Sequence, residues 1–242
     1  MNPAANNEAR NPLALEALRE ARFQATFRNM CRGVADDDGV WIPGPLWWLW
    51  NCTETFDNHW LNKGLPGPYR PFPRLPYMSW LFSSLLTDKI IFIPKSREMM
   101  ISWAVMGYCA WFCQIFEQTR VLVQAQKLEK ASELVKGTEP PGYVRTLWER
   151  QPEWLKKRFP VARELDDLPA DRFVWRNKSA IQAIGKGADQ VRQYHPTIYV
   201  IDEASYMDEA EASFGAAIPV SQQIIVVSSA GPGWFGQICS RE

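Results

Sequence analysis

Four short apolar runs, separated by helix-like segments, constrain the fold of this chain more than any other feature. They are Ile90–Ile93, Arg120–Gln124, Thr197–Ile201 and Gln223–Val227. A run that is apolar at nearly every position predicts a strand buried on both faces, which is typical of parallel sheets covered by helices. Residues 102–116, between the first and second runs, predict a core helix, and residues 127–136, after the second run, predict a more polar one. We therefore expect an α/β fold with a mainly parallel sheet flanked by helices.

The region between the second and third runs predicts further elements. A break at Glu139-Pro-Pro-Gly142 precedes a charged segment, residues 143–170, which is expected to be helical around Trp148, Trp154 and Leu155. Phe173–Trp175 and Ala180–Ile184 then predict a hairpin-like pair of strands.

The first 76 residues differ from the remainder in composition. Asn11-Pro12 predicts the start of a helix, whose loosely amphipathic stripe consists of Leu13, Leu15, Leu18, Phe23 and Phe27. Residues 41–76 are rich in proline and aromatic side chains, which favours an irregular, packed connector. We expect a helical and aromatic-rich segment over residues 1–60 and the α/β core over residues 61–242.

Composition narrows the possible functions. The chain has 27 basic and 27 acidic residues, which disfavours a tight sequence-specific DNA-binding protein but not a motor that grips and releases DNA. Five cysteines without a CxxC pair and only two histidines support neither a disulfide framework nor a zinc site. No signal peptide and no membrane-spanning apolar run is found, so a cytoplasmic protein is expected. The twelve tryptophans favour aromatic packing over a surface that stacks on bases.

Two adjacent carboxylates follow the third apolar run. Asp202 and Glu203 come directly after Tyr199-Val-Ile, at the carboxyl end of the predicted strand. In nucleotide hydrolases with this arrangement the first carboxylate holds magnesium, and the second acts as a general base on the attacking water. A strand that ends in an acidic helix cap would look the same, so this pair alone does not decide the function.

The segment after the first apolar run lies where a phosphate-binding loop belongs, between a strand and a long helix. It departs from the usual Gly-x-x-x-x-Gly-Lys-Ser/Thr pattern: Ile101 stands at the lysine position, no glycine precedes it, and only Ser102 matches. Lys95 opens the loop, and its flexible side chain can reach phosphate from that end because the ammonium acts as a point charge.

This loop resembles the deviant phosphate loops of the large terminases of tailed bacteriophages, some of which carry the lysine at the start. The resembling residues are Lys95, Ser96, Arg97, Glu98, Met99, Met100, Ile101 and Ser102. The resemblance implies that Arg97 contacts or senses the γ-phosphate. It also implies a P-loop NTPase core of the additional-strand (ASCE) type.

Three further segments extend the resemblance over residues 74–236. Ser228, Ser229 and Ala230 are similar to the motif that couples hydrolysis to DNA movement in this family. The segment from Gly185 to Arg192 resembles the family's Gly…Arg segment, which makes Arg192 a phosphate sensor, an inter-subunit arginine or simply a surface ion pair. Tyr77 and Met78 stand near the adenine-recognition motif, where the family usually has glutamine at the position of Met78; Tyr77 is expected either to stack on the base or to pack in the core.

The resemblance implies an ATPase that moves double-stranded DNA into a procapsid in the host cytoplasm. ATP and Mg²⁺ are the implied cofactors, with Ser102 and Asp202 on the metal and Glu203, Arg97 and Arg192 in catalysis. The implied partners are a portal protein, a small terminase subunit and other copies of the chain in a pentameric ring. No nuclease activity is expected, because the acidic clusters that remain, Asp36–Asp38 and Asp166-Asp167, do not follow apolar strands.

Two other functions stay open. A helicase or translocase of the second superfamily shares the Asp-Glu and Ser-Ala motifs, but it would need a Gly-Lys-Thr loop and a second motor domain. A non-hydrolysing nucleotide-binding or capsid-docking module would suit the degenerate loop, but it has no need of Glu203. Nucleotide turnover separates these alternatives.

Overall fold

The computed structural model describes residues 12–138, 140–231 and 233–240. Its helices are α2 (Pro12–Arg32), α3 (Gly44–Cys52), α4 (Met78–Thr87), α5 (Ile101–Ile115), α6 (Leu128–Leu134), α7 (Tyr143–Glu149), α8 (Glu153–Arg158), α9 (Ala188–Arg192), α10 (Ala210–Ala217) and α11 (Trp234–Cys239). Its strands are β1 (Val34–Ala35), β2 (Trp41–Ile42), β3 (Glu54–Phe56), β4 (Tyr69–Pro71), β5 (Ile90–Lys95), β6 (Arg120–Gln124), β7 (Arg172–Val174), β8 (Ala180–Ile184), β9 (Ile198–Asp202) and β10 (Gln223–Ser229). Asn11, from the predicted helix start, and Glu139, from the predicted break, lie outside the described residues.

A six-stranded sheet organises the molecule, in the order β5-β10-β9-β6-β8-β7. Every neighbouring pair is parallel except β7 with β8, which are antiparallel as predicted from the hairpin-like runs. The expected α/β fold with a mainly parallel sheet is therefore confirmed. The strand order also places β10 between β5 and β9, so the strand that carries Ser228 and Ser229 separates the loop strand from the Asp-Glu strand.

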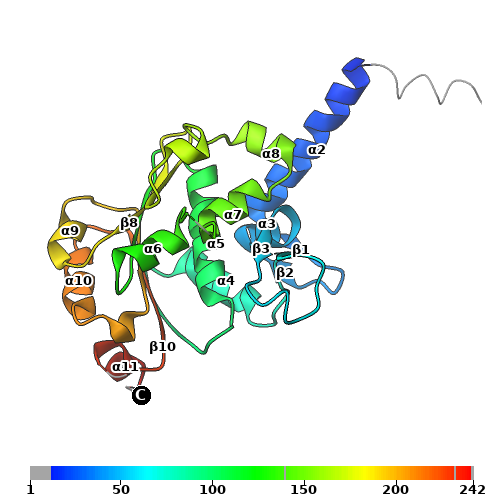
Figure 1. Ribbon diagram of the computed structural model, residues 1–242. Coiled ribbons are helices and arrows are strands. Elements are labelled where there is room, and N and C mark those ends of the chain that lie inside the picture. Colours follow the sequence, from blue (N-terminus) through cyan, green and yellow to red (C-terminus); the bar gives the residue numbers. More distant parts are fainter. Residues whose placement is uncertain (1–11, 139, 232, 241–242) are drawn as a thin grey trace, which may run out of the picture.

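Helices cover both faces of this sheet, as Figure 1 shows. Successive side chains of a strand point to opposite faces, and on β10 Ile225 and Val227 join one hydrophobic cluster while Ile224 and Val226 join the other. The first cluster contains residues of α3 to α8, and the second contains residues of α9 to α11. Continuous apolar runs result because each strand must supply both clusters.

The first strand of the sheet differs from its prediction. Ile90–Ile93 was expected to be a fully buried strand that ends at Pro94, but β5 lies at an edge of the sheet and continues through Pro94 to Lys95. Ile90 is accordingly exposed. An edge strand tolerates proline because one side of its backbone has no hydrogen-bonding neighbour.

The prediction of an irregular connector over residues 41–76 is wrong in two places. Residues 44–52 form α3, with Pro45 in its first turn, and β3 pairs with β4 in an antiparallel ladder. Proline is tolerated at the start of a helix, where the N–H it lacks has no intrahelical partner. Gly44 is required there, since a Cβ would collide with the backbone carbonyl of Met30 on α2. The division at residue 60 stays a prediction, although α3 shares the hydrophobic cluster of α5.

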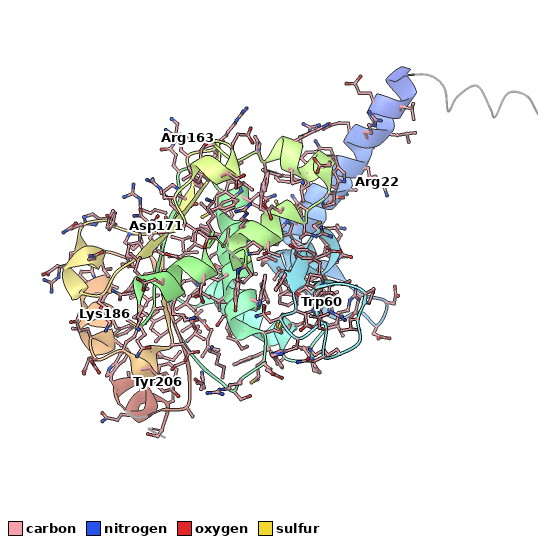
Figure 2. All side chains as sticks on the ribbon, in the orientation of Figure 1. Arg22, Trp60, Arg163, Asp171, Lys186 and Tyr206 are labelled. Carbon is pink, nitrogen blue, oxygen red and sulfur yellow. The ribbon has the colours of Figure 1, made fainter. Side chains whose placement is uncertain are left out.

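The helix α2 confirms only part of its predicted apolar stripe. Phe23 and Phe27 pack against Phe159, and Phe23 also contacts Trp154 of α8. Leu15 and Leu18 are exposed, and α2 projects from the body of the molecule, with side chains such as Arg22 extending away from it (Figures 1 and 2).

Candidate nucleotide-binding site

The site lies at the carboxyl ends of three adjacent strands. In the parallel ladder Ser229 of β10 is beside Lys95 of β5, and Val227 of β10 is beside Asp202 of β9. The three strands therefore end at the same edge of the sheet, with β9 two residues shorter there than β10. Ligands of open α/β sheets bind at this edge, outside the carboxyl ends of the strands.

A continuous polar cluster joins the residues at these ends. The Lys95 ammonium donates to Glu203 Oε1 at 2.9 Å and to Ser102 Oγ at 3.2 Å, and it lies 3.7 Å from Asp202 Oδ1. The Ser102 hydroxyl lies 3.2 Å from each Asp202 carboxylate oxygen. The Ser229 hydroxyl donates to Glu203 Oε2 at 3.1 Å. Five side chains thus meet, four from β5, α5, β9 and β10 and one, Glu203, from the residue directly after β9.

The two carboxylates of this cluster differ in environment. Asp202 is buried, and burial raises the pKa of its carboxyl above the ordinary value; the neighbouring Lys95 ammonium lowers it and Glu203 raises it further. Glu203 is more open, with 38% of its side chain exposed. The two acids can therefore take different roles. The buried Asp202 carboxylate can act as a metal ligand, and the more open Glu203 carboxylate can contact water.

Glu203 has a left-handed backbone conformation, with φ of 57°. This conformation is uncommon for residues other than glycine and costs about 1–2 kcal/mol. Hydrogen bonds to the end of β10 hold the turn that follows: Ser205 N–H donates to Ser228 Oγ, Ser205 Oγ donates to the Ser229 carbonyl, and the Tyr206 hydroxyl donates to the Ala230 carbonyl. These hydrogen bonds therefore connect the segment after β9 to the end of β10.

The loop before α5 contains two left-handed residues, one of them at a position where phosphate loops usually have glycine. Met100, at the position of the second glycine, has φ of 54°, and Glu98 has φ of 63°. The backbone N–H groups of residues 97–100 form no hydrogen bond with any described residue. Unpaired N–H groups at the start of a helix are available to an anion.

Two contacts support this loop. The Tyr77 hydroxyl donates to the Met99 carbonyl, and the Ser96 N–H lies 3.2 Å from the Met99 sulfur. Tyr77 therefore braces the loop. Met78, at the position of the family's glutamine, is fully buried in the core.

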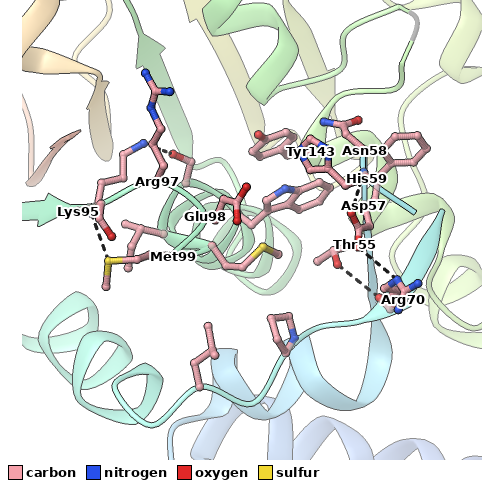
Figure 3. Close-up of a pocket in the computed structure, with 18 of the residues that line it drawn as sticks. Thr55, Asp57, Asn58, His59, Arg70, Lys95, Arg97, Glu98, Met99 and Tyr143 are labelled. Atoms are coloured by element: carbon pink, nitrogen blue, oxygen red, sulfur yellow. Dashed lines mark hydrogen bonds and ion pairs between the residues drawn. The ribbon is translucent and has the colours of Figure 1, made fainter. Parts of the chain in front are cut away.

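The predicted arginines lie outside the polar cluster. Arg97 is exposed on the loop, is one of the residues that line the cavity in Figure 3, and forms no ion pair among the described residues. Arg192, at the end of α9, pairs with Asp189 at 3.2 Å. Its surface ion pair is one of the alternatives that the sequence left open.

A cavity of about 490 Å³ adjoins the loop (Figure 3). Loop residues 95–103 form one wall, and a segment that the sequence did not identify forms the opposite one. We call this opposite wall the distal wall; it consists of Thr55, Phe56, Asp57, Asn58, His59, Lys63, Arg70, Pro71, Pro73 and Leu75. Its sequence carries no recognisable motif, so only the fold brings it to the loop.

Neither a protein-family model nor a curated protein matches the chain. Among solved structures, the large terminase ATPase domain of Thermus phage P74-26 matches with 14% identity over 75% of this chain and 72% of that chain, at a TM-score of 0.44. The large terminase of another thermophilic bacteriophage, in complex with ADP, matches with 14% identity over 75% of this chain and 41% of that chain, also at a TM-score of 0.44. Similarity at this level carries no function from those proteins to this one.

Two features are absent from the described residues. Within the described ranges no group of three or more His, Cys, Asp or Glu side chains forms a metal-binding cluster. No described helix is long and apolar enough to cross a membrane.

Proposed function

We propose that this chain is an ATP-hydrolysing motor domain that moves double-stranded DNA into a viral procapsid. The observation that carries the proposal is the single polar cluster of Lys95, Ser102, Asp202, Glu203 and Ser229, beside a loop with unpaired N–H groups. The DNA-packaging part rests on the resemblance of these motifs to those of large terminases.

Lys95 and the loop bind the phosphates in this proposal. The ammonium is anchored by three oxygens of the cluster, so it is held at the mouth of the loop rather than free in solvent. The N–H groups of residues 97–100 supply further donors. An ammonium bound to phosphate no longer neutralises Glu203, whose carboxylate is then released.

Ser102 and Asp202 fit a magnesium ion. Mg²⁺ prefers oxygen ligands, and in phosphate-transfer sites it usually takes one or two protein oxygens and completes its shell with phosphate and water. A buried carboxylate within 3.2 Å of a hydroxyl provides such a pair. The ion would neutralise charge on the phosphates.

Glu203 is the proposed general base. Its Oε2 accepts a hydrogen bond from Ser229, which fixes the orientation of the carboxylate while part of it stays exposed to water. This carboxylate accepts a proton from the water that attacks the γ-phosphate. Arg97, or an arginine such as Arg192 from a neighbouring subunit, supplies transition-state charge, a contribution of about 10³–10⁵ in rate for arginine fingers.

The partners follow from the same proposal. They are double-stranded DNA, a portal protein, a small terminase subunit and further copies of the chain in a pentameric ring. An isolated subunit is then expected to hydrolyse ATP slowly if the finger comes from its neighbour.

ATP turnover and ATP binding, measured in parallel, test the proposal. Glu203→Gln should abolish turnover and spare binding, because the amide keeps its shape but cannot accept the proton. Lys95→Ala should weaken both, whereas Lys89→Ala, outside the cavity, should change neither. Full turnover by Glu203→Gln rules out this base, and wild-type behaviour of Lys95→Ala rules out the loop assignment. Stimulation of turnover by double-stranded DNA and portal protein tests the packaging role.

A further inference from the structure

The distal wall lies across the cavity from the loop that we propose for the phosphates (Figure 3). A volume of about 490 Å³ is within the range of small-molecule sites, about 300–1,000 Å³. If ATP phosphates lie on the loop, the part of the cavity beyond the loop is left for the nucleoside.

The position expected to read adenine cannot do so in this fold. Met78 is fully buried at the start of α4, and the Tyr77 hydroxyl is committed to the Met99 carbonyl. Neither residue lines the cavity. Any recognition of the base must therefore come from other side chains.

Asp57 holds the distal wall in place. Its Oδ1 accepts the His59 N–H at 2.9 Å, its Oδ2 accepts the Lys63 ammonium at 3.0 Å, and Arg70 Nε lies 3.5 Å from Oδ2. The hydrogen bond from Lys63 and the other contacts lower the pKa of the Asp57 carboxyl below its ordinary value. These contacts thus fix the loop on both sides of Asn58, at Asp57 and at His59.

The wall also has polar groups that the protein leaves unpaired. The Asn58 amide and the His59 ring belong to exposed residues that line the cavity, and neither forms a hydrogen bond with any described residue. The buried Arg70 Nε–H makes no hydrogen bond in the same part of the chain and contacts Asp57 Oδ2 as an ion pair at 3.5 Å. Exposed polar groups at a cavity can exchange their hydrogen bonds with water for hydrogen bonds with a polar ligand.

Aromatic rings line the cavity between its two ends. Trp103 stacks on Tyr143, with ring centroids 4.0 Å apart and planes 6° from parallel, and Phe56 stands in the distal wall. Sites for cofactors combine such apolar walls with a few placed polar groups.

We propose that the distal wall is the nucleoside end of the ATP site and that Asn58 determines base specificity, with Asp57 as its positioning residue. A carboxamide offers a donor and an acceptor side by side, which matches the N6 amino donor and N7 acceptor on one edge of adenine, whereas the same edge of guanine carries two acceptors, O6 and N7. This inference rests on the proposed function and gives Asn58 the adenine-reading role that a glutamine has in the family at the position of Met78.

Equilibrium binding of ATP, GTP and inorganic triphosphate, each with Mg²⁺, tests it on the full chain. Asn58→Ala should weaken ATP binding about tenfold, the effect of losing one two-bond contact to a base. It should narrow the preference for ATP over GTP and leave triphosphate binding unchanged. Asn58→Asp, which keeps the size but removes the donor, should act in the same way. Lys95→Ala should weaken ATP and triphosphate alike.

Asn51→Ala is the matched control, since Asn51 is exposed on α3 outside the cavity and donates only to the Trp47 carbonyl. Unfolding temperatures show whether each variant is folded; the Asn58 side chain makes no bond to a described residue whose loss would unfold the chain. Wild-type ATP affinity in both Asn58 variants, or an equal loss of triphosphate binding, overturns the nucleoside assignment and leaves the ATPase proposal standing. A wild-type chain that binds neither ATP nor triphosphate overturns both.

Discussion

At the scale of single residues, two adjacent serines of β10 have different surroundings and should have different roles. The Ser229 hydroxyl donates to the proposed base Glu203, whereas Ser228 Oγ accepts the Ser205 N–H in a buried position. Ser229→Ala should lower kcat about tenfold, because one hydrogen bond to a charged group is lost, and should leave ATP affinity unchanged. Steady-state kinetics and equilibrium binding check both statements.

Ser228→Ala provides the contrast. The substitution leaves the Ser205 N–H without its acceptor, which costs about 1–3 kcal/mol. We expect a lower unfolding temperature and a smaller effect on kcat than in Ser229→Ala. Equal kinetic effects with equal stability would contradict the separate roles.

The five cysteines offer a second test at this scale. Cys52, Cys109 and Cys113 are buried, and burial raises the pKa of Cys52 and Cys113 to about 12. At pH 8 only about one such thiol in ten thousand is ionised, and the thiolate is the reactive form. Two thiols, Cys31 and Cys239, should therefore react with Ellman's reagent in the native protein, and all five after unfolding. Three or more fast-reacting thiols would contradict the burial.

How far the sequence predicts the site depends on the residue. Lys95, Ser102, Asp202 and Glu203 were identified because each follows or opens a regular element, and parallel strands bring such ends together. Their mutual bonds could not be predicted, since these depend on β10 lying between β5 and β9. Asn58 and the rest of the distal wall were missed because an irregular loop that reaches the site through tertiary packing has no local signal.

At the scale of elements, buried strands were predicted best. A strand that supplies two hydrophobic clusters leaves an unbroken apolar run, and β6, β9 and β10 all show one. The helix α3 was missed because its proline and three tryptophans suggest a connector. Its stability comes from contacts with α2 and α5, such as Leu49 beside Gly107, rather than from helix propensity.

The phosphate loop supports a prediction at this scale. Glu98 is exposed with φ of 63°, a conformation that costs about 1–2 kcal/mol for an L residue and much less for glycine. Glu98→Gly should therefore stabilise the chain by about 0.5–1 kcal/mol after the entropic cost of glycine. Chemical denaturation measures this change in the free energy of unfolding.

Glu129→Gly is the control for that substitution. Glu129 is also exposed, but it lies in the first turn of α6, where glycine should destabilise by about 1 kcal/mol. Opposite signs for the two changes support the left-handed conformation of the loop. Destabilisation by both would show that Glu98 is not left-handed.

At the scale of the whole molecule, the sheet separates two cores with different tasks. The cluster on the side of α9 to α11 contains Phe235 and packs behind the segment after β9, which carries Glu203, and behind β10, which ends at Ser229. The cluster on the other side joins α3, α4 and α5 and so sets the distance between the loop and the distal wall. Substitutions in the cluster that joins α3, α4 and α5 should therefore change nucleotide affinity as well as stability.

The attachment of α2 is the final prediction. Phe27 is half-buried and stacks on Phe159, whereas Leu18, 67% exposed, lies on the projecting part of the same helix. Phe27→Ala should destabilise by about 1–2 kcal/mol, roughly half the cost for a fully buried phenylalanine, and lower the unfolding temperature by a few degrees. Leu18→Ala should stay within about 0.5 kcal/mol of the wild type. Equal effects of the two substitutions would mean that α2 does not pack on α8 through its phenylalanines, and a large effect of Leu18→Ala alone would mean that the projecting half of the helix is covered in solution.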